Sequence, residues 1–336
     1  MHPKYSFSAG INMDTSALSG LLGSYYNGNR IASYISRVYT ENPFRLLLDS
    51  DSERKTAENS LRPVVSVIKD AGIEPVFVFD YTCMGDHHLT ASFQVKLGRL
   101  LGFLDSIGVT SISLSDLYLA ETFSSEQAPY NKFNHFRVYL SRRARINHAI
   151  KLKYLENIKY SAVTLHPDLN RNIDEIKRAV AFAGAEKIEI VLNSGCFEGC
   201  PMEIFCNALR FHLTEEEASD TEEKPVTWYQ DKCNTWLESD TYWTQSMTMI
   251  LPERIGDYIN AGVSNFNILN NPHSALDLKN KLTSYVERKR PKDPAVLIFG
   301  RETSLAGRWE KDIEKSMNFL NTTGRATNAL ARFIEG

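Results

Sequence analysis

The sequence lacks the features that mark several large classes of protein. No apolar run approaches the roughly 18 residues that a membrane-spanning helix needs. The first four residues lead into an alternating, strand-like segment and not into the apolar core of a signal peptide. The formal net charge is only −3, so no strong positive field steers the chain to nucleic acid. We therefore expect a cytoplasmic protein with no membrane association.

Several catalytic signatures are also missing. The chain has no glycine-rich phosphate-binding fingerprint after its first predicted strand and no Walker-type loop. It also lacks the paired histidines of a metalloprotease helix and the nucleophile elbow of a hydrolase. An open, dinucleotide-binding Rossmann sheet is therefore a weak alternative, and nothing in the chain points positively to peptide hydrolysis.

What the sequence does contain is a repeated alternation of strand-like and helix-like segments. With 336 residues, 43% of them hydrophobic, the chain can bury one barrel-sized core. Alternation of this kind predicts a parallel sheet with helices outside it, and the number of units fits a (β/α)8 TIM-type barrel best. The predicted strands are Tyr5–Asn12, Ser33–Tyr39, Pro75–Tyr81, Thr110–Ser115, Arg137–Ser141, Ser161–Leu165, Lys187–Asn193, Trp243–Ile250 and Ser264–Leu269.

One long loop interrupts this alternation of strands and helices. We expect residues 1–292 to form the barrel, including a cysteine-bearing loop at 194–242 that follows a late strand. Connections in such barrels are usually far shorter, and a loop of this length is typically functional. Residues 293–336 should form a short C-terminal extension packed on the barrel, beginning with a strand at Ala295–Phe299.

Four of the five cysteines are clustered in or near that loop, at Cys196, Cys200, Cys206 and Cys233. In a reducing compartment, clustered thiols indicate metal binding or redox chemistry and not disulfide bonds. Four thiolates suit either a 4Fe-4S cluster or a zinc ion. Zinc sites usually repeat a short spacing twice, and only the first pair here has it, so we favour the cluster and keep zinc as the alternative.

Other interpretations of the cysteines stay open. Cys206 and Cys233 could be buried small hydrophobic residues that bind nothing. Cys83 and His212 are further possible ligands, because one follows a predicted strand end and the other lies shortly after Cys206. The sequence does not choose among these.

Polar residues follow several predicted strands, at the edge where TIM-type barrels carry their function. His166 is the best general acid–base candidate, although a hydrogen bond at the start of a helix explains it more simply. Arg171 could clamp a carboxylate or phosphate, or form a surface salt bridge. Asn193 completes the predicted catalytic set, whereas Glu203 is expected to be a solvated loop carboxylate. The same edge should carry Asp80, Arg142 and Arg143.

Around these residues the sequence resembles the collagenase-like peptidase family, peptidase family U32, over roughly residues 5–290. The matching positions are Asn193, Cys196, Cys200-Pro201, Cys233, Pro252-Glu253, Gly262-Val263, Phe266 and Ile268. The resemblance implies a TIM-type barrel and, from the better-understood relatives, a 4Fe-4S cluster used in oxygen-independent hydroxylation of quinone precursors or RNA bases. Asn267 and Asn271 stand where the family has a lysine and an arginine, which puts its recognition of an anionic substrate in doubt.

We therefore expect an iron–sulfur barrel enzyme, or a subunit of one, that hydroxylates or otherwise modifies a small molecule or an RNA base. A hetero-oligomer with a second family member is a further expectation from the resemblance. The alternatives are a zinc-stabilised, non-catalytic binding subunit and, from the family's name, a peptidase.

Overall fold

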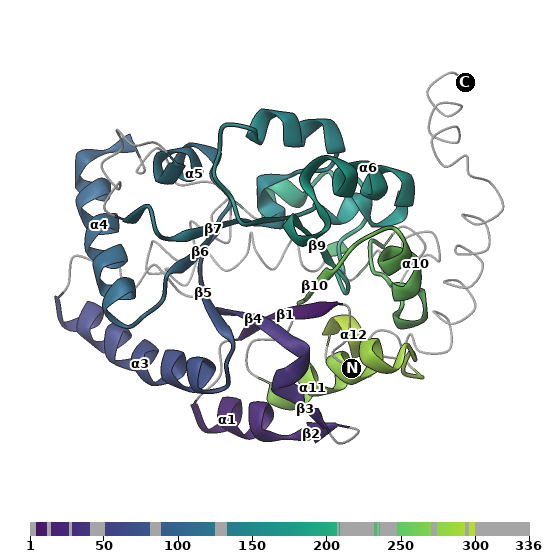
Figure 1. The fold of residues 1–336 in the computed structure, drawn as a ribbon, viewed down its shortest axis with the longest axis horizontal. Helices are drawn as coiled ribbons and strands as arrows, with labels where there is room; N and C mark the ends of the chain where they lie inside the picture. Colours follow the sequence, from purple (N-terminus) through teal and green to yellow (C-terminus); the bar gives the residue numbers. More distant parts are fainter. Residues whose placement is uncertain are drawn as a thin grey trace.

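Eight parallel strands form the core of the protein. The computed structural model describes residues 5–11, 15–26, 29–40, 51–80, 89–124, 133–206, 208, 232–233, 235, 247–269, 274–292 and 296–299. The strands close into a barrel in the order β1-β10-β9-β8-β7-β6-β5-β4, visible as the ring in Figure 1. This confirms the predicted (β/α)8 TIM-type fold. The barrel strands are β1 (Ser6–Ile11), β4 (Ile35–Thr40), β5 (Glu74–Phe79), β6 (Ser111–Leu114), β7 (Arg137–Leu140), β8 (Ala162–Thr164), β9 (Ile188–Val191) and β10 (Asn265–Ile268).

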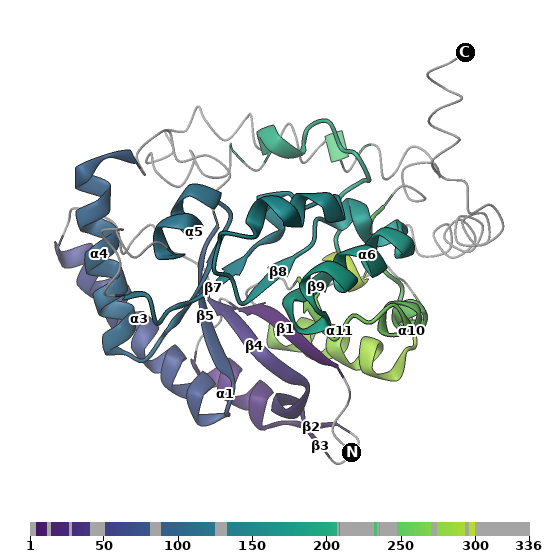
Figure 2. The same ribbon diagram turned by 45° about the horizontal axis from the view of Figure 1, so that its top comes forward.

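Helices surround this barrel, and α1 contacts both α3 and α11 on its outside, as Figures 1 and 2 show. None of the helices in the described residues combines the length and the apolar character that a bilayer crossing requires. The α-helices are α1 (Thr15–Gly23), α3 (Asp51–Asp70), α4 (Ala91–Ser106), α5 (Leu117–Ser124), α6 (Ile173–Ala183), α10 (Ile255–Asn260), α11 (Ala275–Glu287) and α12 (Val296–Phe299).

Shorter elements connect these helices and strands. A small hairpin, β2 (Tyr25–Tyr26) with β3 (Asn29–Arg30), lies between α1 and β4. The 3-10 helices are η1 (Ile31–Tyr34), η4 (Arg142–Ala144), η5 (Ala149–Leu155), η6 (Pro167–Arg171), η7 (Ala185–Lys187) and η8 (Pro252–Arg254). Two of them, η4 and η6, directly follow barrel strands and shape the barrel mouth described below.

Helix α4 illustrates how local sequence sets an element. The Thr90 hydroxyl caps the helix by accepting a hydrogen bond from the Phe93 amide at 3.2 Å. Leu97 and Leu104 recur on one face and are buried against the barrel. Gly108 then adopts a φ of 75°, a left-handed conformation that glycine tolerates, and turns the chain into β6.

The barrel closes where its first and last strands meet. Phe7 of β1 is in register with Phe266 of β10 on one side and with Ile35 of β4 on the other. The Tyr5 ring packs edge-on against both phenylalanine rings, with centroids 5.7 and 5.9 Å away. Aromatic packing and strand pairing therefore join the chain's beginning to residues more than 250 positions later.

Two predicted strands are not strands of the barrel. Of Trp243–Ile250, the described part, residues 247–250, contributes only an isolated antiparallel bridge between Met247 and Phe197. The strand that pairs with β1 and closes the barrel is β10. The strand predicted at Ala295–Phe299 is the short helix α12, which places buried Leu297 next to the end of β9. Residues 300–336 lie outside the described residues, so the proposed domain boundaries stay a prediction.

Candidate functional site

The predicted functional residues gather at the carboxyl ends of three neighbouring strands. His166 follows β8 and is the N-cap residue of η6. Asn193 and Cys196 follow β9, and η4, which carries Arg142, follows β7. Because all strands of the barrel are parallel, these residues lie at one rim, where TIM-type barrels carry their active sites.

Asn193 ties this rim together. Its side chain is 2% exposed, and its amide nitrogen donates hydrogen bonds to the carbonyl oxygens of Leu269 (2.6 Å) and Leu297 (2.7 Å). Its Oδ1 atom accepts a hydrogen bond from the Leu269 amide at 2.7 Å. Asn193 therefore holds the end of β9 to the end of β10 and to α12. A direct part in chemistry stays a prediction.

His166 lies between two carboxylates. Its Nε2 atom is 2.8 Å from Oε1 of Glu203, and its Nδ1 atom is 3.4 Å from Oδ2 of Asp168. Burial alone would lower the pKa of His166, but hydrogen bonds to Asp168 and Glu203 and their negative charges outweigh it and raise the pKa above its usual value. The ring can therefore hold a proton near neutral pH, as a general acid must.

The same carboxylates attach the cysteine segment to the barrel. Oδ1 of Asp168 accepts a hydrogen bond from the Gly199 amide at 3.1 Å. Oε2 of Glu203 lies 3.4 Å from Nη1 of Arg145. Burial would raise the pKa of both carboxyl groups, yet His166 and Arg145 keep each pKa below its usual value. The expectation of a solvated Glu203 was wrong, because its side chain is 16% exposed and paired on both oxygens.

Arg171 is engaged by the protein backbone. Its Nε atom donates a hydrogen bond to the Met247 carbonyl oxygen at 3.0 Å, and Nη2 donates to the same oxygen. Met247 in turn pairs with Phe197, between the first two cysteines of the cluster. Through Met247, Arg171 thus helps to hold the segment that carries Cys196 and Cys200. The anion clamp predicted for Arg171 stays a prediction.

Three of the clustered cysteines are within electrostatic range of one another. Burial raises the pKa of the Cys196 thiol, and the charge of Cys206 adds to the effect. Burial also raises the pKa of Cys200, with contributions from Cys196 and Cys206. Cys196, Cys200 and Cys206 are free thiols, and Cys233 is partly buried. Cys83 and His212 lie outside the described residues.

Cys196 lies at the barrel mouth beside a charged side chain. Its side chain keeps exposed surface, and burial of the thiol raises its pKa. Arg142 is its charged neighbour and opposes the rise in the Cys196 pKa, as a cation beside a thiolate does.

The donor chemistry of these residues fits a thiolate-bound metal centre. In the described part of the chain, no three His, Cys, Asp or Glu side chains are already arranged as a metal site. Most of the segment between Cys206 and Cys233 lies outside that part. The thiols that the structure groups, with a cation beside them, are nevertheless the ligands that iron–sulfur clusters and structural zinc prefer.

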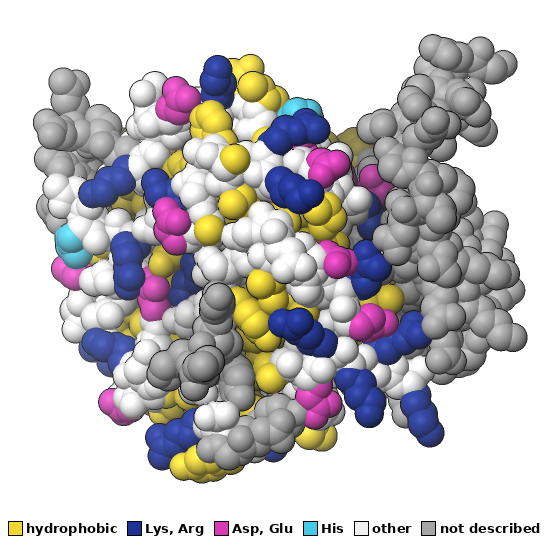
Figure 3. All heavy atoms as spheres, turned by 45° about the vertical axis from the view of Figure 1, so that its right-hand side comes forward, with side chains coloured by type: hydrophobic (Ala, Val, Ile, Leu, Met, Phe, Trp, Pro, Cys, Tyr) yellow, Lys and Arg dark blue, Asp and Glu magenta, His cyan; other side chains and the backbone are white. Residues whose placement is uncertain are grey.

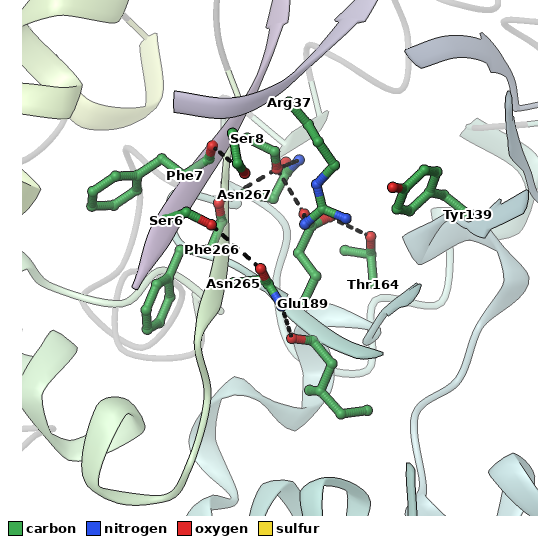
Figure 4. A network of polar contacts seen from close by, with 12 residues as sticks. Ser6, Phe7, Ser8, Arg37, Tyr139, Thr164, Glu189, Asn265, Phe266 and Asn267 are labelled. Atoms are coloured by element: carbon green, nitrogen blue, oxygen red, sulfur yellow. Dashed lines mark hydrogen bonds and ion pairs between the residues drawn. The ribbon is translucent and has the colours of Figure 1, made fainter. Parts of the chain in front are cut away.

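Sequence reasoning missed a polar network inside the barrel (Figure 4). Oε1 of Glu189 accepts a hydrogen bond from Ser8 Oγ and pairs with Arg37 Nη2, each at 2.7 Å, while Oε2 accepts from Thr164 Oγ1 at 2.6 Å. Asn267 Nδ2 donates to Ser8 Oγ at 2.8 Å. TIM-type barrels usually fill this space with branched apolar side chains. The charged residues within two barrel strands, Arg37 in β4 and Glu189 in β9, were the signal that could have revealed it.

Comparisons with known proteins agree with the barrel and the motifs. No family model matches the chain. A curated protein of Methanocaldococcus jannaschii, named uncharacterized protease MJ1657, is 29% identical over 143 residues, which are 42% of this chain and 40% of that protein. The chain thus matches less than half of that relative's length.

A solved structure gives the second comparison. The U32 peptidase Mk0906 has a TM-score of 0.53 and 16% sequence identity, over 79% of this chain and 93% of that one. At this identity the likeness concerns the fold. Together with the cysteine motifs and the partial match to the archaeal protease, the shared barrel makes this chain similar to the collagenase-like peptidase family U32.

Proposed function

We propose that the chain is an iron–sulfur-cluster-binding barrel protein in which Cys196, Cys200, Cys206 and Cys233 hold one 4Fe-4S cluster. The observation that carries the proposal is that Cys196, Cys200 and Cys206, beyond the carboxyl end of β9, lie near enough for the charge of one thiol to raise the pKa of another. The fourth ligand would be Cys233, which is partly buried. Four cysteine thiolates are the usual ligand set of such a cluster.

The reaction would be a redox modification, such as oxygen-independent hydroxylation, of a small molecule or an RNA base. A bound cluster supplies electron transfer or activation of the substrate. The chain's own part is to hold a proton at His166, between Asp168 and Glu203, and to place the positive charge of Arg142 beside Cys196. The protein would be the enzyme itself or a subunit that works with a second family member.

The distribution of charged side chains on the surface bears on how an RNA substrate could bind. On the face in Figure 3, the described Lys and Arg side chains are interspersed with Asp and Glu. That face therefore offers no broad basic surface for a phosphate backbone among the described residues.

Two other functions have less support. A zinc-stabilised, non-catalytic binding subunit is favoured only by the short spacing between Cys196 and Cys200. Peptidase action is named in the descriptions of both relatives. In the described part of this chain, however, His166 contacts the carboxylates of Asp168 and Glu203 and not a nucleophilic hydroxyl or thiol.

Metal analysis after anaerobic purification tests the proposal. We expect about four iron atoms per chain with a matching amount of acid-labile sulfide, most of which Cys196→Ser should remove. Cys83→Ser removes the fifth cysteine, which the sequence left open as a ligand, and wild-type iron in this variant would assign the cluster to the other four. A colourless protein that contains stoichiometric zinc would support the binding subunit instead.

A further inference from the structure

Residues 247–250 lie beside the backbone that carries Cys196. Both the amide and the Oγ1 atom of Thr248 donate hydrogen bonds to the Cys196 carbonyl oxygen, each at 3.0 Å. The Ile250 amide donates to the Leu192 carbonyl oxygen at 2.7 Å. Thr248 is 0% exposed, so water does not compete for its hydrogen bonds. Thr248 therefore holds the backbone of Cys196 with two donors at once.

Thr248 is in turn held by the side chain of Asn170, which belongs to η6. The Nδ2 atom of Asn170 donates hydrogen bonds to the carbonyl oxygens of Thr248 (2.8 Å) and Val191 (2.7 Å). Val191 is the last residue of β9, the strand that leads to Cys196. One amide group thus joins the end of a barrel strand to the residue that holds Cys196. Its orientation is fixed, because the amide oxygen in place of the nitrogen would repel both carbonyl oxygens.

The oxygen of the same amide group shows why an asparagine is needed here. Oδ1 of Asn170 is buried and has no hydrogen-bond partner among the residues that the structure describes, and the whole residue is 0% exposed. A buried acceptor without a partner is unfavourable and calls for an explanation. The two hydrogen bonds that Nδ2 donates supply one. The backbone of Asn170 is itself anchored, since its carbonyl oxygen accepts a hydrogen bond from the buried Tyr258 hydroxyl.

We propose that Asn170 is a positioning residue, which fixes Cys196 through Thr248 and so holds this cysteine in place before a metal binds. The inference goes beyond the proposed function and rests on it only for the role of Cys196 as a ligand. The chain of hydrogen bonds from Asn170 to Cys196 needs no cluster, so the two claims can fail separately. A change at Asn170 should loosen residues 247–250 even in protein that contains no metal.

Hydrogen exchange of the metal-free, full-length protein tests the positioning. Asn170→Asp keeps the size of the side chain but turns the donating group into an oxygen that faces two carbonyl oxygens. The exchange rate of the amides of residues 247–250 should rise about tenfold more than that of the amides of β6, a barrel strand that reports global unfolding. An equal rise in both segments would assign Asn170 to overall stability and overturn the inference.

Asn172→Asp is the matched control. It makes the same change from amide to carboxylate two residues further along the chain, where Asn172 is exposed and its Oδ1 atom accepts a hydrogen bond from the Glu175 amide at 3.0 Å. A carboxylate accepts this bond equally well. Both segments should therefore exchange within about twofold of wild type. A loosening of residues 247–250 as large as in Asn170→Asp would contradict the inference, since a nearby negative charge would then suffice.

Two variants of Thr248 test the second step of the chain of hydrogen bonds, and they decide the matter if Asn170→Asp fails to fold. Thr248→Val removes the hydroxyl that donates to Cys196 and keeps the size of the side chain, whereas Thr248→Ser keeps the hydroxyl. Residues 247–250 should exchange about threefold faster in Thr248→Val, and Thr248→Ser should restore the wild-type rate. Equal rates in the two variants would show that the hydroxyl does not hold Cys196.

Iron analysis separates the positioning from the proposed function. In iron-loaded protein, Asn170→Asp should release iron to a chelator about threefold faster than wild type does. Release at the wild-type rate, together with faster exchange of residues 247–250, would overturn the claim that Asn170 holds a ligand in place. Wild-type protein that binds no iron, while its variants show the expected exchange rates, would contradict the proposed function and leave the positioning of Cys196 standing.

Discussion

The Nε2 atom of His166 lies 2.8 Å from Oε1 of Glu203, and this contact joins the end of β8 to the segment between Cys200 and Cys206. The histidine is a fixed part of the barrel rim, and Glu203 belongs to the loop that carries the proposed ligands. Any change in the charge of this pair should therefore alter how firmly the loop is held.

The first prediction concerns stability and pH. Because the folded state raises the pKa of His166, the charged contact stabilises the fold fully below the unfolded-state value near 6.5, and this stabilisation is lost as the pH rises through the raised value. His166→Gln should therefore cost about 1.5–3 kcal/mol at pH 6 and clearly less at pH 9. Urea unfolding of both proteins across this range measures the difference. A cost that grows with pH would contradict the assignment.

A second prediction concerns the ion pair inside the barrel. Arg37→Met removes the guanidinium that pairs with the Glu189 carboxylate, which is 1% exposed and also accepts hydrogen bonds from the Ser8 and Thr164 hydroxyls. Removing one partner of a buried pair typically costs about 3–5 kcal/mol. Replacing both residues by methionine should cost less than the two single changes added together.

Surface pairs give the control for that experiment. Lys177 and Asp174 lie 3.2 Å apart on α6 with side chains that are 56% and 78% exposed. Lys177→Met should cost less than about 1 kcal/mol, since exposed pairs contribute little. Equal losses for Arg37→Met and Lys177→Met in urea unfolding would show that the interior pair does not stabilise the barrel.

A third prediction separates structure from chemistry at Asn193. Asn193→Ala removes two donated hydrogen bonds and one accepted hydrogen bond among groups at the junction of β9, β10 and α12. We expect a loss of about 2–4 kcal/mol, since buried backbone groups are left without partners. Thermal unfolding measures it. An unchanged melting temperature with loss of turnover would assign Asn193 to the reaction instead.

A fourth prediction concerns metal retention. Asp168→Ala removes the acceptor for the Gly199 amide, which is adjacent to Cys200, and one partner of His166. The loosened loop should lose iron to a chelator several-fold faster than the wild-type loop. Asp174→Ala, on the exposed face of α6, removes the same charge and should leave the rate unchanged. Identical rates in all three proteins would show that Asp168 does not position the ligands.

Much of the barrel could be predicted because its strands carry a strong local pattern. The apolar run Pro75–Tyr81 contains most of β5, and the parallel topology followed from the strand–helix alternation. Short apolar runs were less reliable: Ala295–Phe299 suits a strand or a buried helix equally well. Trp243–Ile250 was wrongly predicted to be a barrel strand, because local sequence does not reveal which segment pairs with β1 to close the barrel.

In the candidate site, too, some features could be predicted from the sequence and others could not. The strand-end positions of His166 and Asn193 followed from topology alone, since parallel strands share one rim. Their partners did not, because Glu203 and Leu297 approach from distant parts of the chain. Burial of Glu203 and the Arg37–Glu189 pair depend on packing that no local pattern encodes.

X-ray absorption of the anaerobically purified protein at the iron and zinc edges distinguishes a bound iron–sulfur cluster from a bound zinc ion. We expect iron surrounded by sulfur, with further iron atoms as near neighbours, and loss of this signal in Cys196→Ser. Zinc bound by four sulfurs without a neighbouring metal, or no bound metal at all, would contradict it.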